Sequence, residues 1–226
     1  RRNSWAQLTM LQEHFWVEGD RLLGMVPPHW QVPWPPAARH DAFNLVALPA
    51  LLGVVAAGNH RHVLAGAALY FLVDSLWVLL EPRSVRSPGT ILQHHAVVGG
   101  LLLAPALLPE LLPFVSRALA VEVNTFFLIA RRSCHKNRAP WPLRHTCSTL
   151  FYLSWVAVRL VYYPLLTAQL VRAWQARTGE VGTPWNLVLI GPAGLAVLNL
   201  LNFKWTVDLV RSKLRKGRKE DQYKAL

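Results

Sequence analysis

Cysteine is nearly absent from this sequence of 226 residues, which contains only Cys134 and Cys147. Two cysteines cannot supply a disulfide framework, so other interactions must hold the fold together. Both lie in a basic stretch that we expect to face a reducing compartment. With His135 and His145 they give the order Cys-His-x9-His-x-Cys, which matches no common zinc spacing. We therefore expect ordinary loop residues there, with no metal and no cofactor.

Charged residues are also scarce, at 16% of the chain against 53% hydrophobic residues, which is unusual for a soluble domain of this size. Acidic residues are the scarcer kind, because 12 of them stand against 24 basic residues, for a net charge of +12. The basic residues gather between apolar runs and in the carboxyl-terminal tail, which suits contact with anionic lipid headgroups. Zinc-finger and aromatic-basic RNA-binding motifs are missing, so no nucleic-acid partner is expected.

Long hydrophobic runs, by contrast, are plentiful. Six of them have about the 17 to 25 residues that a helix needs to cross a ~30 Å hydrocarbon core. They cover residues 42–58, 62–80, 91–108, 112–130, 149–171 and 185–206. The sequence therefore predicts an all-α, polytopic membrane protein whose six transmembrane helices form one domain over residues 42–210.

The amino-terminal region, residues 1–41, is not predicted to span the membrane, because acidic residues and a Pro/Trp-rich stretch interrupt it. Trp5, Leu8, Leu11 and Phe15 recur at spacings of three and four, which gives a helix one apolar face. Such a helix either lies along the lipid headgroups or packs on the domain as a short soluble helix.

The two ends of the chain carry further signals. The sequence begins with Arg1 instead of methionine, so we expect a longer precursor. Residues 211–226 form a basic tail. Most other basic residues in the connections fall on the same side as this tail, whereas the opposite side holds only Arg61, Arg172 and Arg177. This asymmetry predicts both termini on the cytosol-like or matrix-like side of the endoplasmic reticulum or another endomembrane, with the mitochondrial inner membrane as the alternative.

Ionisable residues occur inside four of the predicted spans, where each is costly without a partner or a wet cavity. They are Asp74, the pair His94 and His95, Glu122 and Arg159. All lie in the half of the membrane nearer the basic side, so we expect them to meet in one pocket. The side chains of adjacent histidines diverge by ~100° on a helix, so one is expected to face the cavity and the other a neighbouring helix.

Two interpretations fit such a cluster, one catalytic and one structural. A histidine oriented by Asp74 or Glu122 suits general-base or nucleophilic acyl transfer. Alternatively, the same side chains form only an internal polar network that fixes the packing of the helices.

The order of these residues resembles the TLC-domain family over residues 42–210. The resemblance rests on Tyr70-x3-Asp74, His94-His95, Glu122-x-Asn124-Thr125, Arg159 before Tyr163-Pro164, and Leu198-Asn199-x2-Asn202-x2-Trp205. The family implies a bundle or barrel of membrane helices around a lipid-accessible cavity. It includes ceramide synthases, which use paired histidines, and smaller members tied to lipid composition, sensing or trafficking. The synthases have a run of aspartates where this chain has Glu122-Val-Asn-Thr, so it is more similar to the small TLC domain-containing proteins.

We therefore expect a protein that binds a phospholipid or acyl chain in an intramembrane polar cavity. One alternative is an acyl-CoA-dependent acyltransferase of the ceramide-synthase type. Another is a non-catalytic accessory subunit that has other membrane subunits as partners, for example in a mitochondrial complex. The residues expected at a catalytic centre are His94, His95, Asp74 and Glu122. Those expected to contact lipid are Tyr70, Arg159, Tyr163, Asn199, Asn202 and Trp205.

Overall fold

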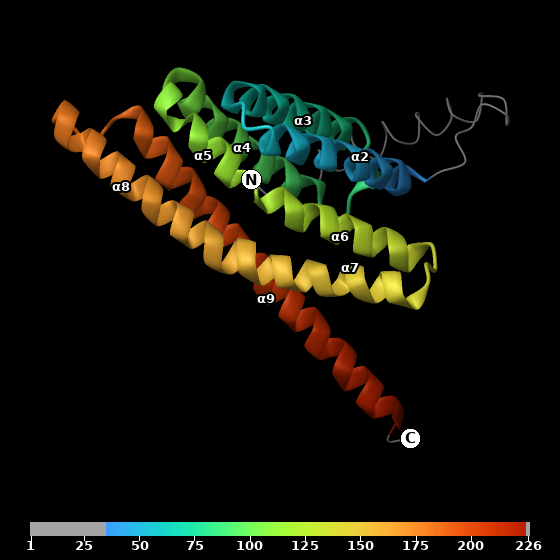
Figure 1. Ribbon diagram of the computed structural model, residues 1–226. Helices are drawn as coiled ribbons and strands as arrows, with labels where there is room; N and C mark the ends of the chain where they lie inside the picture. Colours follow the sequence, from blue (N-terminus) through green and yellow to red (C-terminus); the bar gives the residue numbers. More distant parts are fainter. Residues whose placement is uncertain (1–34, 225–226) are drawn as a thin grey trace, which may run out of the picture. The chain divides into compact units, whose positions relative to one another are not determined.

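The computed structural model describes residues 35–224, with side chains described as far as residue 214. In this part of the chain all regular structure is helical, which confirms the predicted all-α class. The α-helices (Figure 1) are α2 (Pro36–Ala56), α3 (His60–Leu80), α4 (Pro88–Leu107), α5 (Leu112–Ala118), α6 (Val121–Lys136), α7 (Trp141–Ser154), α8 (Tyr163–Val181) and α9 (Ile190–Lys224). The apolar face predicted at Trp5, Leu8, Leu11 and Phe15 lies outside the described residues.

Five helical stretches are long and apolar enough to cross a membrane, in agreement with a multi-pass protein. They are His60–Leu80, Pro88–Leu107, Pro109–Lys136, Trp141–Val181 and Leu187–Leu214. The first predicted span, residues 42–58, is helical as far as Ala56 but is not among the five. It belongs to α2, which begins at Pro36, a residue type favoured in the first turn of a helix. Arg39, His40 and Asp41 follow within this helix and lower its hydropathy.

Large apolar side chains cover the outside of the helices. Val46, Leu80, Leu200 and Phe203 are each about two thirds exposed or more. A protein in water rarely displays such a surface, whereas lipid tails cover it at no cost. The side chains packed between helices, by contrast, include many polar ones.

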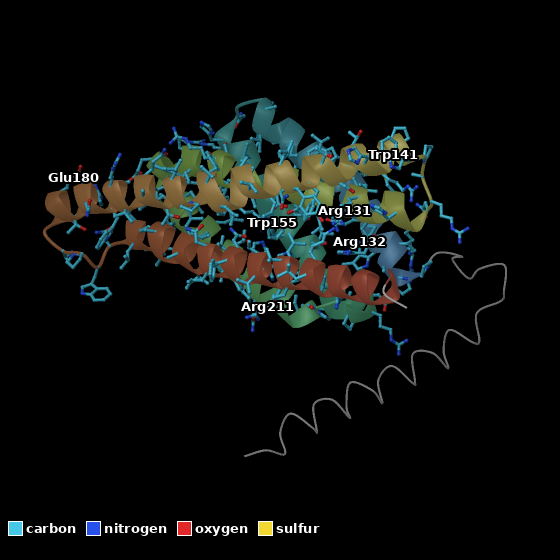
Figure 2. All side chains as sticks on the ribbon, turned by 90° about the horizontal axis from the view of Figure 1, so that it is seen from below. Arg131, Arg132, Trp141, Trp155, Glu180 and Arg211 are labelled. Carbon is cyan, nitrogen blue, oxygen red and sulfur yellow. The ribbon has the colours of Figure 1, made fainter. Side chains whose placement is uncertain are left out.

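Helices that follow one another in the chain pack as neighbours: α3 with α4, α6 with α7 and α8 with α9. In addition, α2 packs on α3 and α6, and α4 packs on α9 (Figure 1). The turn after α8 begins at Gly182, whose φ of 71° lies in the left-handed region that a residue without Cβ adopts freely. Arg131 and Arg132 lie in the half of the bundle that holds Trp141, and Glu180 lies at the opposite end (Figure 2). We call the half with Arg131 and Arg132 the basic end.

Two interruptions shape the interior. The first separates α5 from α6, where the N–H of Glu122 donates to the carbonyl of Leu119 instead of that of Ala118. The second is a π-helical stretch, Trp155–Tyr162, between α7 and α8. It ends two residues before Pro164, which has no N–H to donate and whose ring would crowd the carbonyl of Leu160 in a regular α-helix. Because a π-turn is wider than an α-turn, it accommodates this missing bond while the helix continues.

Candidate functional site

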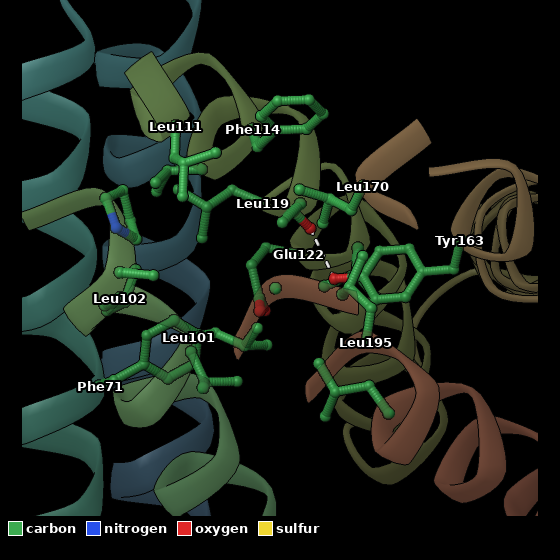
Figure 3. A pocket seen from close by; sticks show the side chains of 18 of the residues that line it. Phe71, Leu101, Leu102, Leu111, Phe114, Leu119, Glu122, Tyr163, Leu170 and Leu195 are labelled. Carbon is green, nitrogen blue, oxygen red and sulfur yellow. Dashed lines mark hydrogen bonds between the residues drawn. The ribbon is translucent and has the colours of Figure 1, made fainter. Parts of the chain in front are cut away.

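A cavity of about 70 Å³ lies among α4, α5, α6, α8 and α9 (Figure 3). Its walls are mostly apolar, and leucines such as Leu101 and Leu195 are the most frequent residue type. Three polar side chains take part in the lining: His94, Glu122 and Tyr163. In Figure 3, Glu122 stands between α4 on one side and Tyr163 on the other.

The cavity is elongated and has one polar end. Along α4 its lining runs from His94 to Pro105, which corresponds to roughly 16 Å of helix. Among the lining residues of α4, His94 is the one nearest the basic end. Tyr163 is the nearest on α8, and Glu122 is the nearest on the segment that includes α6. The remainder of the lining, toward Pro105, is apolar. The shape suits a linear apolar chain with one polar terminus.

Asp74 lies outside this cavity, in a buried network formed by α2, α3 and α4. Its Oδ1 is 2.7 Å from Nε2 of His40 and accepts from Nδ2 of Asn44 at 3.3 Å. Its Oδ2 is 3.4 Å from Nε2 of His95. The hydroxyl of Tyr70 donates to Oδ1 of Asn44 at 2.7 Å. All polar groups of this network are therefore engaged with one another, apart from Nδ1 of His40.

The two adjacent histidines face different surroundings. His95 is buried, and its Nδ1 lies 3.0 Å from Oγ of Ser75. His94 lines the cavity, and its buried Nδ1 has no hydrogen-bond partner. The rings nearest to His94 belong to His95 and Trp205, with centroids 5.7 and 5.8 Å away.

Arg159 is the centre of a second buried network, on the other side of His94. The π-helical stretch turns its guanidinium inward, where Nε donates to Oδ1 of Asn124 and Nη1 to Oδ1 of Asn202, both at 2.7 Å. Nη2 donates to the hydroxyl of Thr125 at 3.3 Å. The guanidinium also lies over the rings of Trp155 and Trp205, 5.0 and 5.5 Å from their centroids. Cation–π contacts of this kind stabilise a desolvated charge.

Glu122 is connected to this second network. Its carboxylate hydrogen-bonds with Thr125, one turn further along α6, and interacts electrostatically with Arg159. It also stands in the first turn of α6, where the helix dipole favours a negative charge. Glu122 thus links the polar end of the cavity to the buried network of Arg159.

The expectation of one pocket shared by all these side chains is only partly met. Of the five ionisable residues, only His94 and Glu122 line the cavity, whereas Asp74, His95 and Arg159 are held in the two flanking networks. Among the expected lipid contacts, Tyr163 lines the cavity, while Tyr70, Asn202 and Trp205 belong to the networks. Asn199 lies apart from both and donates to the hydroxyl of Thr167 at 2.8 Å.

Two residues of the first network were not predicted. His40 and Asn44, both on α2, are 5% and 2% exposed, and both contact Asp74. Their spacing of four places them on one face of a helix, which was a usable signal. His40 was overlooked because it precedes the apolar run of residues 42–58 and was assigned to the non-spanning amino-terminal region.

No group of three or more histidine, cysteine or acidic side chains suited to a metal ion occurs in the part of the chain that the structure describes. The sulfur atoms of Cys134 and Cys147 lie 3.8 Å apart. The neighbouring histidines point to other partners, since His135 contacts Ser148 and His145 stacks on Trp141.

Comparison with known proteins gives one match. A family model described as the TLC domain matches residues 55–211, which is well over half of the chain. Neither the curated proteins nor the solved structures gave a match. The matched range begins in the last turn of α2, so His40 and Asn44 precede it.

Proposed function

The chain belongs to the TLC-domain family, and we propose that it handles a membrane lipid by holding one acyl chain in the cavity, with the polar terminus of that chain at His94 and Glu122. The observation that carries the proposal is that His94 lines the cavity at its polar end while its buried Nδ1 has no hydrogen-bond partner. A buried polar atom without a partner costs about 1–3 kcal/mol, and a ligand that hydrogen-bonds to it removes that cost.

The polar end must provide most of the selectivity. Apolar walls attract an acyl chain from water, but the tails of the bilayer are as apolar as the leucines of the cavity. Transfer of a chain from the bilayer into the cavity therefore gains little from the walls alone. Hydrogen bonds to His94 and Glu122 are available only in the cavity, so they distinguish a bound lipid from the surrounding ones.

The charge of this end favours a neutral ligand terminus. The positive charge of Arg159 already acts on the carboxylate of Glu122. A phosphate placed beside Glu122 would add a further negative charge in a medium of low dielectric constant, and no arginine or lysine among the described residues lines the cavity to compensate it. A hydroxyl, amide or ester group suits His94 and Glu122 better, and a phosphate of the same lipid would remain at the basic end.

The experiment compares two neighbouring leucines of α4. Leu102 lines the cavity, whereas Leu103 is 53% exposed and faces outward. Leu102→Trp should fill the cavity, and Leu103→Trp should not. Native mass spectrometry of the protein purified in mild detergent should show a lipid adduct in the wild type and in Leu103→Trp, with most of it lost in Leu102→Trp. A folded Leu102→Trp variant that keeps the same adduct would rule out this cavity as the binding site.

Acyl transfer is a second candidate function, and it is favoured by the same free imidazole nitrogen. A neutral imidazole next to a carboxylate is suited to remove a proton from an acceptor group or to carry an acyl group transiently. Turnover on a panel of acyl-CoA donors and amine acceptors, lost in His94→Ala protein that still folds, would establish it. If no acceptor reacts while the lipid adduct is present, binding without transfer is the function.

A role as an accessory subunit predicts a different observation. The protein would then be recovered in a larger membrane assembly when it is extracted in mild detergent from its native membrane. A monomer that carries lipid argues for action as a single chain.

A further inference from the structure

Asp74 lies between two imidazoles in the first buried network, His40 from α2 and His95 from α4. The carboxylate oxygens face them separately, Oδ1 at 2.7 Å from His40 and Oδ2 at 3.4 Å from His95. Each of the three side chains is less than a tenth exposed. Because water cannot supply missing partners here, the hydrogen-bond pattern itself restricts where protons are placed.

The contacts of Ser75 assign the protons of His95. The hydroxyl of Ser75 donates to the carbonyl of Phe71 at 2.6 Å, so its own proton is engaged. The 3.0 Å contact between Oγ of Ser75 and Nδ1 of His95 then needs a proton on Nδ1. If His95 were neutral, its Nε2 would present a lone pair to the carboxylate of Asp74, which is repulsive. A second proton, on Nε2, converts this contact into an ion pair.

The contacts of His40 assign a neutral ring. Its Nε2 donates to Asp74, and its Nδ1 is buried without any partner. A lone pair left without a donor is the less costly choice at Nδ1, because an unpaired buried N–H in a charged ring would be desolvated completely. His40 therefore serves as a hydrogen-bond donor to Asp74, and His95 supplies the positive charge.

The balance of buried charges leads to the same assignment. Three buried carboxylates occur among the described residues: Asp41, Asp74 and Glu122. Asp41 is paired with Arg132, and Glu122 lies with Arg159. Asp74 has no arginine or lysine partner among the ion pairs of this region, so a histidine is the cationic partner that these contacts offer it. An unbalanced carboxylate in the membrane interior is strongly disfavoured.

We propose that His95 is held as an imidazolium paired with Asp74, and that His40 is the positioning residue that turns the second oxygen of Asp74 toward His95. His40 and Asn44 both bind the same oxygen, Oδ1, which leaves Oδ2 for His95. Both come from α2, outside the matched TLC range. A fixed positive charge then lies beside His94, whose ring centroid is 5.7 Å from that of His95. Two residues that precede the matched family range, His40 and Asn44, therefore belong to the network that adjoins the polar end of the cavity.

Histidine nitrogen NMR tests the assignment directly, because the imidazolium and the two neutral tautomers give distinct signals. The full chain, with its nine histidines labelled with nitrogen-15, is measured in lipid nanodiscs at a pH roughly 1.5 units above the ordinary histidine pKa of ~6.5. The wild type should show one imidazolium, which disappears in His95→Gln and in Asp74→Asn. A wild type without an imidazolium, or one whose imidazolium survives in His95→Gln, overturns the ion pair.

Conservative variants test His40. The amide nitrogen of a glutamine reaches the place of Nε2, so His40→Gln should retain the imidazolium signal of His95. The amide of an asparagine is too short to reach Asp74, so His40→Asn should lose most of that signal even though it is also polar. Equal signals in the two variants would show that His40 does not position Asp74. Because both variants keep a polar amide on α2, general loss of packing affects them alike.

Discussion

The hydroxyl of Tyr163 lies 2.6 Å from the carbonyl oxygen of Ala118, the acceptor that the break between α5 and α6 leaves without its helical partner (Figure 3). In a continuous helix the N–H of Glu122 would donate to this oxygen, but it donates to Leu119 instead. Within a membrane no water replaces such a lost bond. Tyr163 thus allows α6 to begin at the depth that places Glu122 in the cavity.

Tyr163→Phe should therefore lower the stability of the folded protein. The substitution removes one buried hydrogen bond and leaves the carbonyl of Ala118 unpaired, a cost of about 1–3 kcal/mol. Thermal unfolding in detergent is the measurement, with Tyr162→Phe as the control. Tyr162 has a hydroxyl that makes no hydrogen bond in the described region, so its loss should change the unfolding temperature little. Equal effects of the two substitutions would contradict this role of Tyr163.

A second prediction concerns Asp41 and Arg132, which join the start of α2 to the end of α6. Arg132 donates from Nε and Nη2 to the two carboxylate oxygens of Asp41, a bidentate pairing. Asp41 is buried, but the side chain of Arg132 is 46% exposed, so the coupling should fall between those of surface and buried pairs. We expect about 1–2 kcal/mol in a double-mutant cycle of Asp41→Asn and Arg132→Gln.

The matched control for that cycle is the pair Lys204 and Asp208 on α9. Both side chains are more than half exposed, and the contact is an ordinary pair at a spacing of four. Its coupling should not exceed about 0.5 kcal/mol. A coupling of Asp41 with Arg132 as small as this would mean that the pair contributes nothing beyond a surface ion pair.

A third prediction uses two glycines of packed helices. A Cβ added at Gly194 would lie 2.5 Å from Cδ2 and 2.7 Å from Cγ of Leu101, whereas a Cβ at Gly100 meets nothing within 4 Å. Gly100→Ala should stabilise α4 by up to about 1 kcal/mol, the ordinary gain in a helix. Gly194→Ala should have the opposite sign and destabilise by about 1–3 kcal/mol, because α4 and α9 must move apart or Leu101 must rotate. Leu101 lines the cavity, so Gly194→Ala should also reduce the lipid adduct seen by native mass spectrometry. Stabilisation by both substitutions would contradict the close packing at Gly194.

That the ionisable residues lie close to one another could be predicted from the sequence, but the direction of each side chain could not. Counting residues from the ends of the apolar runs placed Asp74, His95, Glu122 and Arg159 near one level, and the structure has them in adjoining networks. Which of them faces the cavity depends on the rotation of each helix about its axis. The break before Glu122 and the π-helical stretch around Arg159 both change that rotation, and neither follows from hydropathy.

The limits of helix prediction explain the residues that were missed. Hydropathy identifies a span by its continuous apolar run, and α2 has one only after Asp41. Its polar first turns are stable because they pack on α3 and α6, where Asp74 and Arg132 supply partners. Such long-range partners are not visible in a local window, so His40 and Asn44 were outside the predicted site.

The last prediction concerns the sidedness of the chain. The helix from Trp141 to Val181 has 41 residues, or roughly 60 Å, about twice the ~30 Å thickness of the hydrocarbon core, so it is long enough to cross the membrane with both ends outside that core. The connection before it follows the basic end of α6, and the connection after it contains the exposed Trp185.

In a background that lacks Cys134 and Cys147, Asn137→Cys should react with a membrane-impermeant maleimide from the cytosol-like or matrix-like side. Thr183→Cys should react only from the other side, because basic residues are retained inside. Each cysteine serves as the control for the other, since both stand in turns. Reversed labelling would overturn the orientation that we infer, and labelling of both from one side would contradict the transmembrane placement of this helix.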